Sequence, residues 1–110
     1  MSYSILRPVK GRPYVLTASG TGYNVYRVTS GRKFYLTNLV ITNDASTEAV
    51  ITIYDAASSA TPEFKILVPL RNTTILSEDD LEKLDLEFLS SVNVWTDVSG
   101  VWIRVGGYEV

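Results

Sequence analysis

The sequence predicts an all-β protein, an antiparallel β-sandwich with one short helix near residues 78–84. Turn-forming clusters recur at short intervals, and the runs between them are rich in Val, Ile, Thr, Tyr and Phe. Short strands with regularly spaced turns are typical of sandwiches and barrels rather than of alternating β/α folds. The clusters are GRP at 11–13, SGTG at 19–22, SGR at 30–32, NDAS at 43–46, ASSATP at 57–62, RN at 71–72, DVSG at 97–100 and GG at 106–107.

These boundaries delimit nine strands, expected near residues 14–18, 23–29, 33–43, 49–54, 64–68, 73–76, 86–89, 92–96 and 101–108. In the third of them, the apolar residues change face between Leu36 and Leu39. A single inward face therefore requires a β-bulge near Thr37 and Asn38. Without a bulge both faces are buried, so either case places this strand deep in the fold.

The helix is predicted from SEDDLEKLDL, residues 77–86. Ser77 can cap it, the three acids that follow suit a helix start, and two leucines then fall three residues apart. The acids, Glu78, Asp79 and Asp80, could instead bind calcium. They lack the alternating spacing of a calcium-binding loop, so a solvated helix start is favoured.

The chain has 110 residues, of which 45% are hydrophobic, enough for one compact domain. We expect an extended N-terminal arm at 1–13 and a single sandwich domain at 14–110. Pro8 and Pro13 each remove a backbone donor, which argues against a central strand in the arm. The arm is nevertheless too apolar for a simple disordered tail. It packs on something else or forms an edge strand on its own sheet, and the sequence leaves both readings open.

Cysteine and histidine are both absent from the sequence. This excludes disulfides, thiol nucleophiles, imidazole bases and the usual transition-metal ligands. No phosphate-binding or dinucleotide-binding motif is present either. We therefore predict no enzyme, no cofactor and no catalytic or metal site.

No apolar run approaches the roughly 20 residues that cross a bilayer, and the N-terminus lacks the features of a signal peptide. The charges are divided along the chain. Residues up to Asn43 include six basic side chains and no acid, whereas the rest carries all 12 acids and four basic side chains. The two parts are expected to attract each other, and balance within one molecule is favoured over attraction between neighbours.

The segment VNVWTDVSGVWIRV, residues 92–105, contains both tryptophans. If DVSG is a four-residue hairpin loop, Trp95 faces Trp102 and Asn93 faces Arg104 on the outer side of the hairpin. An exposed aromatic pair beside an arginine is enriched at protein interfaces, which is the favoured reading. Mutual support of the hairpin by the two indoles and a stacking platform for a sugar ring are the alternatives.

Three segments together carry a resemblance: GRKFYLTNLVITND at 31–44, KILVPLRNTTIL at 65–76 and VWIRVGGYEV at 101–110. They resemble small single-domain β-sandwich proteins of tailed phages and other viruses, of jelly-roll type, which are minor capsid, decoration or fibre-associated components. The similarity covers residues 31–110 and matches only strand cores and the Val68–Pro69 turn.

The resemblance implies a jelly roll with a structural role in a virion and no catalytic residues. It implies trimers or pentamers, other virion proteins as partners, and a soluble cytoplasmic form before assembly. An arm reaching onto a neighbouring subunit would suit such an assembly. The candidate interface residues are Trp95, Trp102, Asn93 and Arg104, with Ile5, Leu6, Arg7, Val9, Lys10 and Arg12 in the arm.

A carbohydrate-binding or receptor-binding module is the second function class. It would stack sugars on Trp95 and Trp102 and bind their hydroxyls through Asn93 and Arg104. Nucleic-acid binding ranks third, because a pI near 5.0 opposes a continuous phosphate track.

Overall fold

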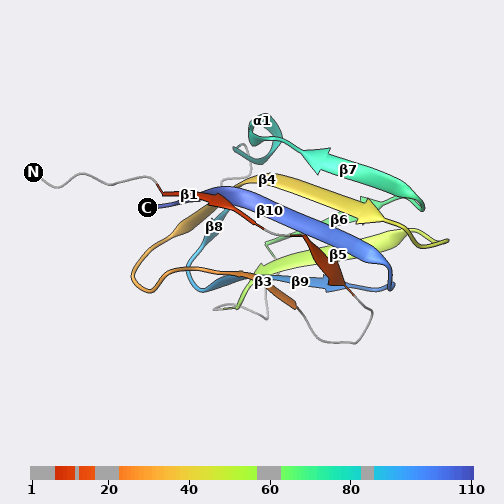
Figure 1. Ribbon diagram of the computed structural model, residues 1–110, viewed down its shortest axis with the longest axis horizontal. Coiled ribbons are helices and arrows are strands. Elements are labelled where there is room, and N and C mark those ends of the chain that lie inside the picture. The colour runs from red at the N-terminus through yellow and green to blue at the C-terminus, as the bar shows by residue number, and fades with distance from the viewer. Residues whose placement is uncertain (1–6, 12, 17–22, 57–62, 83–85) are drawn as a thin grey trace, which may run out of the picture.

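A computed structural model describes residues 7–11, 13–16, 23–56, 63–82 and 86–110. It is an antiparallel β-sandwich of two sheets with one short helix, which confirms the predicted fold class (Figure 1). Sheet A contains β1 (Arg7–Lys10), β2 (Tyr14–Leu16), β4 (Phe34–Asn43), β7 (Asn72–Leu76), β8 (Glu87–Phe88) and β10 (Val101–Glu109). Sheet B contains β3 (Tyr23–Arg27), β5 (Ala49–Asp55), β6 (Phe64–Val68) and β9 (Ser91–Thr96).

The strands pair in a nested order. β1 and β2 at the start of the chain pair with β10 at its end, β3 pairs with β9, β4 with β7, and β5 with β6. Two further pairings, β10 with β4 and β9 with β5, join these couples into the two sheets. The chain therefore passes from one sheet to the other between β9 and β10.

This crossing makes the predicted hairpin over residues 92–105 wrong. β9 and β10 follow each other in sequence but belong to different sheets, joined by the 97–100 segment in which Gly100 has a φ of 88°. Alternation along a strand reports which side chains point inward. It says nothing about whether the next strand is a neighbour in the same sheet or a partner in the opposite one.

The core lies between the sheets and follows the predicted alternation. Val92 and Val94 of β9 are fully buried, as is Val101 of β10. The interior is completed by aromatic side chains, with the ring centroids of Phe34 and Phe88 6.3 Å apart. Burial of such aliphatic and aromatic surface is the main driving force for folding.

Of the two alternatives for residues 33–43, the structure shows the bulge, in β4. Asn38 pairs with Gly106 and Leu36 pairs with the next residue, Gly107. Thr37 is therefore an extra residue of β4 that has no partner position in β10. The extra residue lets Leu36 and Leu39 both point inward, and both are buried. β4 is also central, with β10 on one side and β7 and β8 on the other.

The glycine pair opposite this bulge is asymmetric. A Cβ at Gly107 would lie 2.0 Å from the carbonyl oxygen of Tyr35 and 2.9 Å from the ring of Phe34. A Cβ at Gly106 would meet its nearest atom, the Cβ of Asn38, at 3.4 Å. The close approach of β10 to β4 therefore depends on Gly107 and tolerates a side chain at Gly106.

We expect Gly107→Ala to lower the free energy of unfolding by about 3 kcal/mol or more, because backbone must move to admit the methyl group. Gly106→Ala is the matched control and should change it by less than about 1 kcal/mol. Urea denaturation of both variants measures the difference. Equal stability of the two would contradict the register of β10 against β4.

The helix α1 (Glu78–Glu82) lies where it was predicted, and residues 83 and 84 lie outside the described part. The carbonyl of Ser77 accepts from the amides of Asp80 and Leu81 at 3.1 and 3.0 Å. In return the carboxylate of Asp80 accepts from the amide and the hydroxyl of Ser77 at 3.0 and 3.1 Å. The helix therefore starts directly after Ser77, but the hydroxyl of Ser77 donates to Asp80 and does not accept from the helix amides as the predicted cap would. The fully buried Leu81 anchors the helix to the core.

Part of the predicted arm belongs to the sandwich. Residues 7–10 form β1, which pairs with residues 106–109 of β10, so the edge-strand alternative describes them. Its central Val9 packs against the core. β1 and β2 share one margin of sheet A, and the backbone amide of Gly11 between them donates to Val105 at 2.9 Å.

Candidate interaction surface

The two tryptophans lie on opposite outer faces of the sandwich. Trp95 of β9 is paired in register with Thr52 of sheet B and is half-buried. Trp102 of β10 is paired with Thr42 and Val15 of sheet A and is 48% exposed. Their outward direction agrees with the predicted alternation, but they form no common patch. Asn93 lies on the same outer face as Trp95, and Arg104 lies on the same outer face as Trp102.

The outer face of sheet A is the broader apolar surface. Residues in register share a face, so one row across it consists of Val15, Trp102, Thr42 and Thr73, and the next of Arg104, Val40 and Ile75. We call these seven residues the Trp102 face. Val15, Trp102 and Ile75 are 52, 48 and 67% exposed, which is unusual for large apolar side chains so close together.

Charge is nearly absent from this face, since Arg104 is its one charged side chain. The Nε of Arg104 donates to the carbonyl of Gly11 at 3.1 Å, which orients the guanidinium along the sheet. The hydroxyls of Thr42 and Thr73 bond each other at 3.0 Å, so the polar groups of the face are partly satisfied within it. Aromatic and apolar groups with an arginine and few other charges are the composition of interface centres.

A shallow groove of about 600 Å³ continues from this face along β10. Gly106 contributes no side chain there, and the groove lies between Pro8 of β1 and the β4 residues Asn38 and Val40. A smaller hollow of about 270 Å³ beside Trp102 shares Val40 and Arg104 with the groove. Arg104 therefore lines both hollows.

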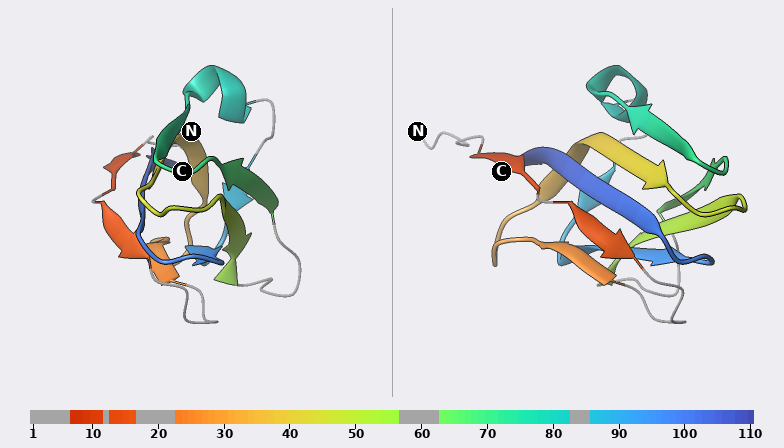
Figure 2. Two further views of the ribbon diagram at one scale, coloured as in Figure 1. Left: turned by 90° about the vertical axis from the view of Figure 1, so that its right-hand side faces the viewer. Right: turned by 45° about the vertical axis from the view of Figure 1, so that its right-hand side comes forward.

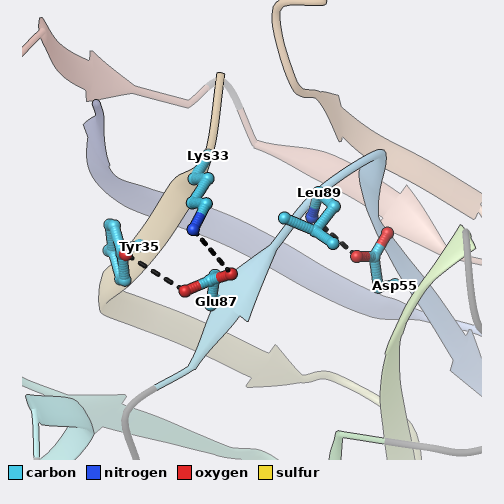
Figure 3. Close-up of polar contacts among 5 residues, drawn as sticks. All are labelled: Lys33, Tyr35, Asp55, Glu87 and Leu89. Atoms are coloured by element: carbon cyan, nitrogen blue, oxygen red, sulfur yellow. Dashed lines mark hydrogen bonds and ion pairs between the residues drawn. The ribbon is translucent and has the colours of Figure 1, made fainter. Parts of the chain in front are cut away.

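The other end of the same sheet face is polar. Glu87 of β8 accepts a hydrogen bond from the hydroxyl of Tyr35 at 3.0 Å and lies 3.7 Å from the ammonium of Lys33 (Figure 3). Tyr35 also stacks on Tyr108 with ring centroids 5.3 Å apart. The Lys33–Glu87 pair joins the basic first part of the chain to the acidic second part within one molecule, as the charge distribution led us to expect.

Two buried carboxylates have structural partners. Asp55 accepts from the backbone amides of Leu89, Ser90 and Ser91 at 2.6, 3.1 and 3.2 Å, and Figure 3 shows the first of these bonds. Glu109 accepts from the hydroxyl of Tyr26 and, at 2.9 Å, from the amide of Thr29. Each carboxylate thus holds a connecting segment against the end of the sandwich.

The phase of these two acids along their strands is a signal in the sequence that they point inward. Asp55 is in phase with the inward Ile51 and Ile53, and Glu109 is in phase with the inward Ile103 and Val105. An acid that continues the inward alternation of a strand must find hydrogen-bond donors on folding. Their partners come from distant segments, which the sequence alone does not identify.

Glu63 lies near the carboxylates of Asp55 and Glu87 at the polar end of the sandwich. The pKa of its carboxyl is raised above the ordinary value of 4.5, first by partial burial and then by the negative charges of Asp55 and Glu87. Ionisation of Glu63 therefore opposes folding. This loss of stability is absent at pH below the unfolded-state pKa, where the carboxyl is protonated in both states. It grows as the pH rises and is complete above the folded-state pKa.

Glu63→Gln should consequently be at least as stable as the unchanged protein at pH 7, and its advantage should disappear near pH 3, where the carboxyl is protonated in both states. Thermal unfolding at a series of pH values measures this. Glu48→Gln, at another exposed glutamate, is the control. The stability difference between Glu63→Gln and the unchanged protein is compared at the two pH values. A difference that is less favourable to the variant at pH 7 than at pH 3 would contradict the raised pKa of Glu63.

The arm candidates divide into two groups. Arg7, Val9 and Lys10 belong to β1, with Val9 half-buried against the core, whereas Ile5, Leu6 and Arg12 lie outside the described residues. The structure therefore places Trp102 and Arg104 together, and Trp95 and Asn93 on the opposite face.

Within the described ranges no group of three or more acidic, histidine or cysteine side chains is placed to hold an ion. Of the acids weighed as calcium ligands, Asp80 is engaged in the cap of α1.

No protein-family model and no curated protein matches the chain. Among the described residues, no helix is both long and apolar enough to span a membrane.

Proposed function

We propose that this chain is a non-enzymatic structural protein of a virion, a capsid, decoration or fibre-associated component that acts by association with copies of itself and with other virion proteins. The observation that carries the proposal is the Trp102 face. It exposes three large apolar side chains on a regular sheet and carries one charge. Apolar surface of this kind, with few charges, is typical of sites that bind a partner.

The strand order supports the same proposal. Counting β1 with β2 as one strand and leaving out the two-residue β8, the order is first, eighth, third and sixth in sheet A, and second, seventh, fourth and fifth in sheet B. This nesting of eight strands supports the jelly-roll arrangement that the resemblance implies, a fold used by capsid proteins and also by lectins. The fold alone does not assign function, so the surface carries the argument.

The buried acids are consistent with a protein without catalytic chemistry. Asp55 and Glu109 use their carboxylates to hold backbone and tyrosine groups of the fold. Acids with structural partners are not poised to exchange protons with a substrate. Trimers or pentamers remain the stoichiometries that the resemblance implies.

Trp102→Ala should weaken self-association by about tenfold or more, because truncation of a central interface tryptophan removes a large desolvated contact. Sedimentation equilibrium over a range of concentrations measures the effect. Trp95→Ala is the control on the opposite face and should leave association within about twofold.

The monomer should remain folded in Trp102→Ala, since this side chain is half exposed, and circular dichroism checks this. An unchanged protein that is monomeric at every concentration, without other virion proteins present, would remove the support for self-association. Equal effects of the two variants would remove the support for the Trp102 face.

A glycan-binding role is the second candidate, favoured by Arg104 and Trp102 lining one depression beside a groove of about 600 Å³. One indole with an adjacent guanidinium is sufficient to stack a sugar ring and bind its hydroxyls. Trp95→Phe leaves Trp102 as the sole indole reporter. Saturable quenching of its fluorescence by a glycan, with no oligomer formed, would favour this candidate over assembly.

A further inference from the structure

The strand β7 is a sheet edge without the usual protection against pairing with another chain. Natural edge strands carry prolines, charges or bulges that discourage such pairing. β1 contains Pro8, β6 contains Lys65, and β3 ends in Arg27 and has a register shift between Asn24 and Tyr26. The remaining edge strands, β2 and β8, are only 3 and 2 residues long. β7 reads NTTIL, with no proline and no charge.

The free side of β7 is open to a partner. β7 pairs with β4 along Asn72–Leu76, and none of the described strands pairs with its other side. Figures 1 and 2 show β7 at the margin of sheet A, with α1 following beyond its end. Ile75, the most exposed of the large apolar side chains described, is on this strand at 67%.

β7 is also suited to pair with itself. An antiparallel pairing of two copies centred on Thr74 would place Asn72 opposite Leu76 and Thr73 opposite Ile75, using all five residues. Thr73 and Ile75 point to the same sheet face, so the exposed Ile75 would pack on a β-branched neighbour of the other copy. No charged pair is created within the strands.

Charges just outside the strand complement each other in this arrangement. The same register places Arg71, which precedes β7, beside Ser77 of the other copy, where the acidic turn of α1 begins. Arg71 and Asp79 are both exposed, and neither forms an ion pair with another described side chain. The twofold axis would repeat the basic-to-acidic contact at both ends of the paired strands.

We propose that β7 pairs antiparallel with β7 of a second copy of this chain across a twofold axis at Thr74, with Arg71 of each copy against the acidic turn of the other. This contact joins the two A sheets edge to edge. It rests on the proposed self-association and adds a surface distinct from Trp102, so one chain can use its face in one contact and its edge in another.

The test is a charge exchange measured by sedimentation equilibrium. Arg71 has a φ of 52°, a conformation that Asp also tolerates, so Arg71→Asp should preserve the turn. Asp79 is chosen over Asp80, which caps the helix. Arg71→Asp and Asp79→Arg should each weaken the twofold contact by about tenfold, and the combined variant should restore it, because the contact is then present with reversed signs.

Arg27→Asp, at the edge of sheet B, is the matched control and should have no effect on association. Hydrogen exchange provides the second readout. The amides of residues 73–76 should exchange more slowly as the unchanged protein associates, while those of β3 keep their rate.

Three results are possible beyond the expected one. If the unchanged protein associates but the charge variants keep its affinity, or if exchange in β7 does not depend on concentration, the edge contact is wrong and the assembly function stands. If the combined variant fails to recover, the pairing register centred on Thr74 is wrong. A chain that never associates overturns both proposals.

Discussion

The pairing of β10 with β4 is the contact on which the rest of the structure depends. It runs from Val101 to Glu109 against Asn43 to Phe34, so it joins the end of the chain to a strand about 65 residues earlier in the sequence. Loop closure over such a separation costs conformational entropy, and close packing of the two strands must offset that cost. The bulge at Thr37 and the absent side chain at Gly107 provide that packing, since they let β10 approach β4 closely while keeping both inward faces apolar.

Placing β10 in sheet A separates the two tryptophans. The chain must cross the core after β9, so the outward direction at Trp95 and the outward direction at Trp102 lie on opposite sides of the sandwich. The same crossing collects Trp102, Arg104 and the outward residues of β4 into one face. The surface on which the functional proposal rests is thus a consequence of sheet topology, and Arg104 is held there by a carbonyl from the segment between β1 and β2.

Charge is distributed in a way that fits an assembling protein. The carboxylates of Asp55, Glu87 and Glu109 are engaged with tyrosines, a lysine and backbone amides at one end of the sandwich. The Trp102 face carries only Arg104, and the edge strand β7 carries no charge. Interfaces that bury few charges avoid the cost of removing unpaired ions from water.

Much of this fold was determined by the sequence alone. Period-two alternation and the turn clusters predicted the positions of the strands after residue 13 and the inward and outward residues of β9 and β10, because these properties depend on neighbours along the chain. They also gave the bulge near Thr37 and Asn38 as one of two alternatives. The position of α1 was predicted for the same reason, whereas the acceptance of two Ser77 hydrogen bonds by Asp80 was not.

Only the tertiary structure decided which strands are neighbours. Trp95 and Trp102 were assigned to one hairpin because strands adjacent in sequence often pair. In the structure β1 and β2 pair with one side of β10 and β4 pairs with its other side, so β9 cannot pair with β10. The sequence likewise indicates that the side chains of Asp55 and Glu109 point inward, but it does not identify their hydrogen-bond partners. The reason is that side-chain direction is a local property of the backbone, whereas sheet membership is settled by the competition of all strands for the same hydrogen-bonding edges and the same core.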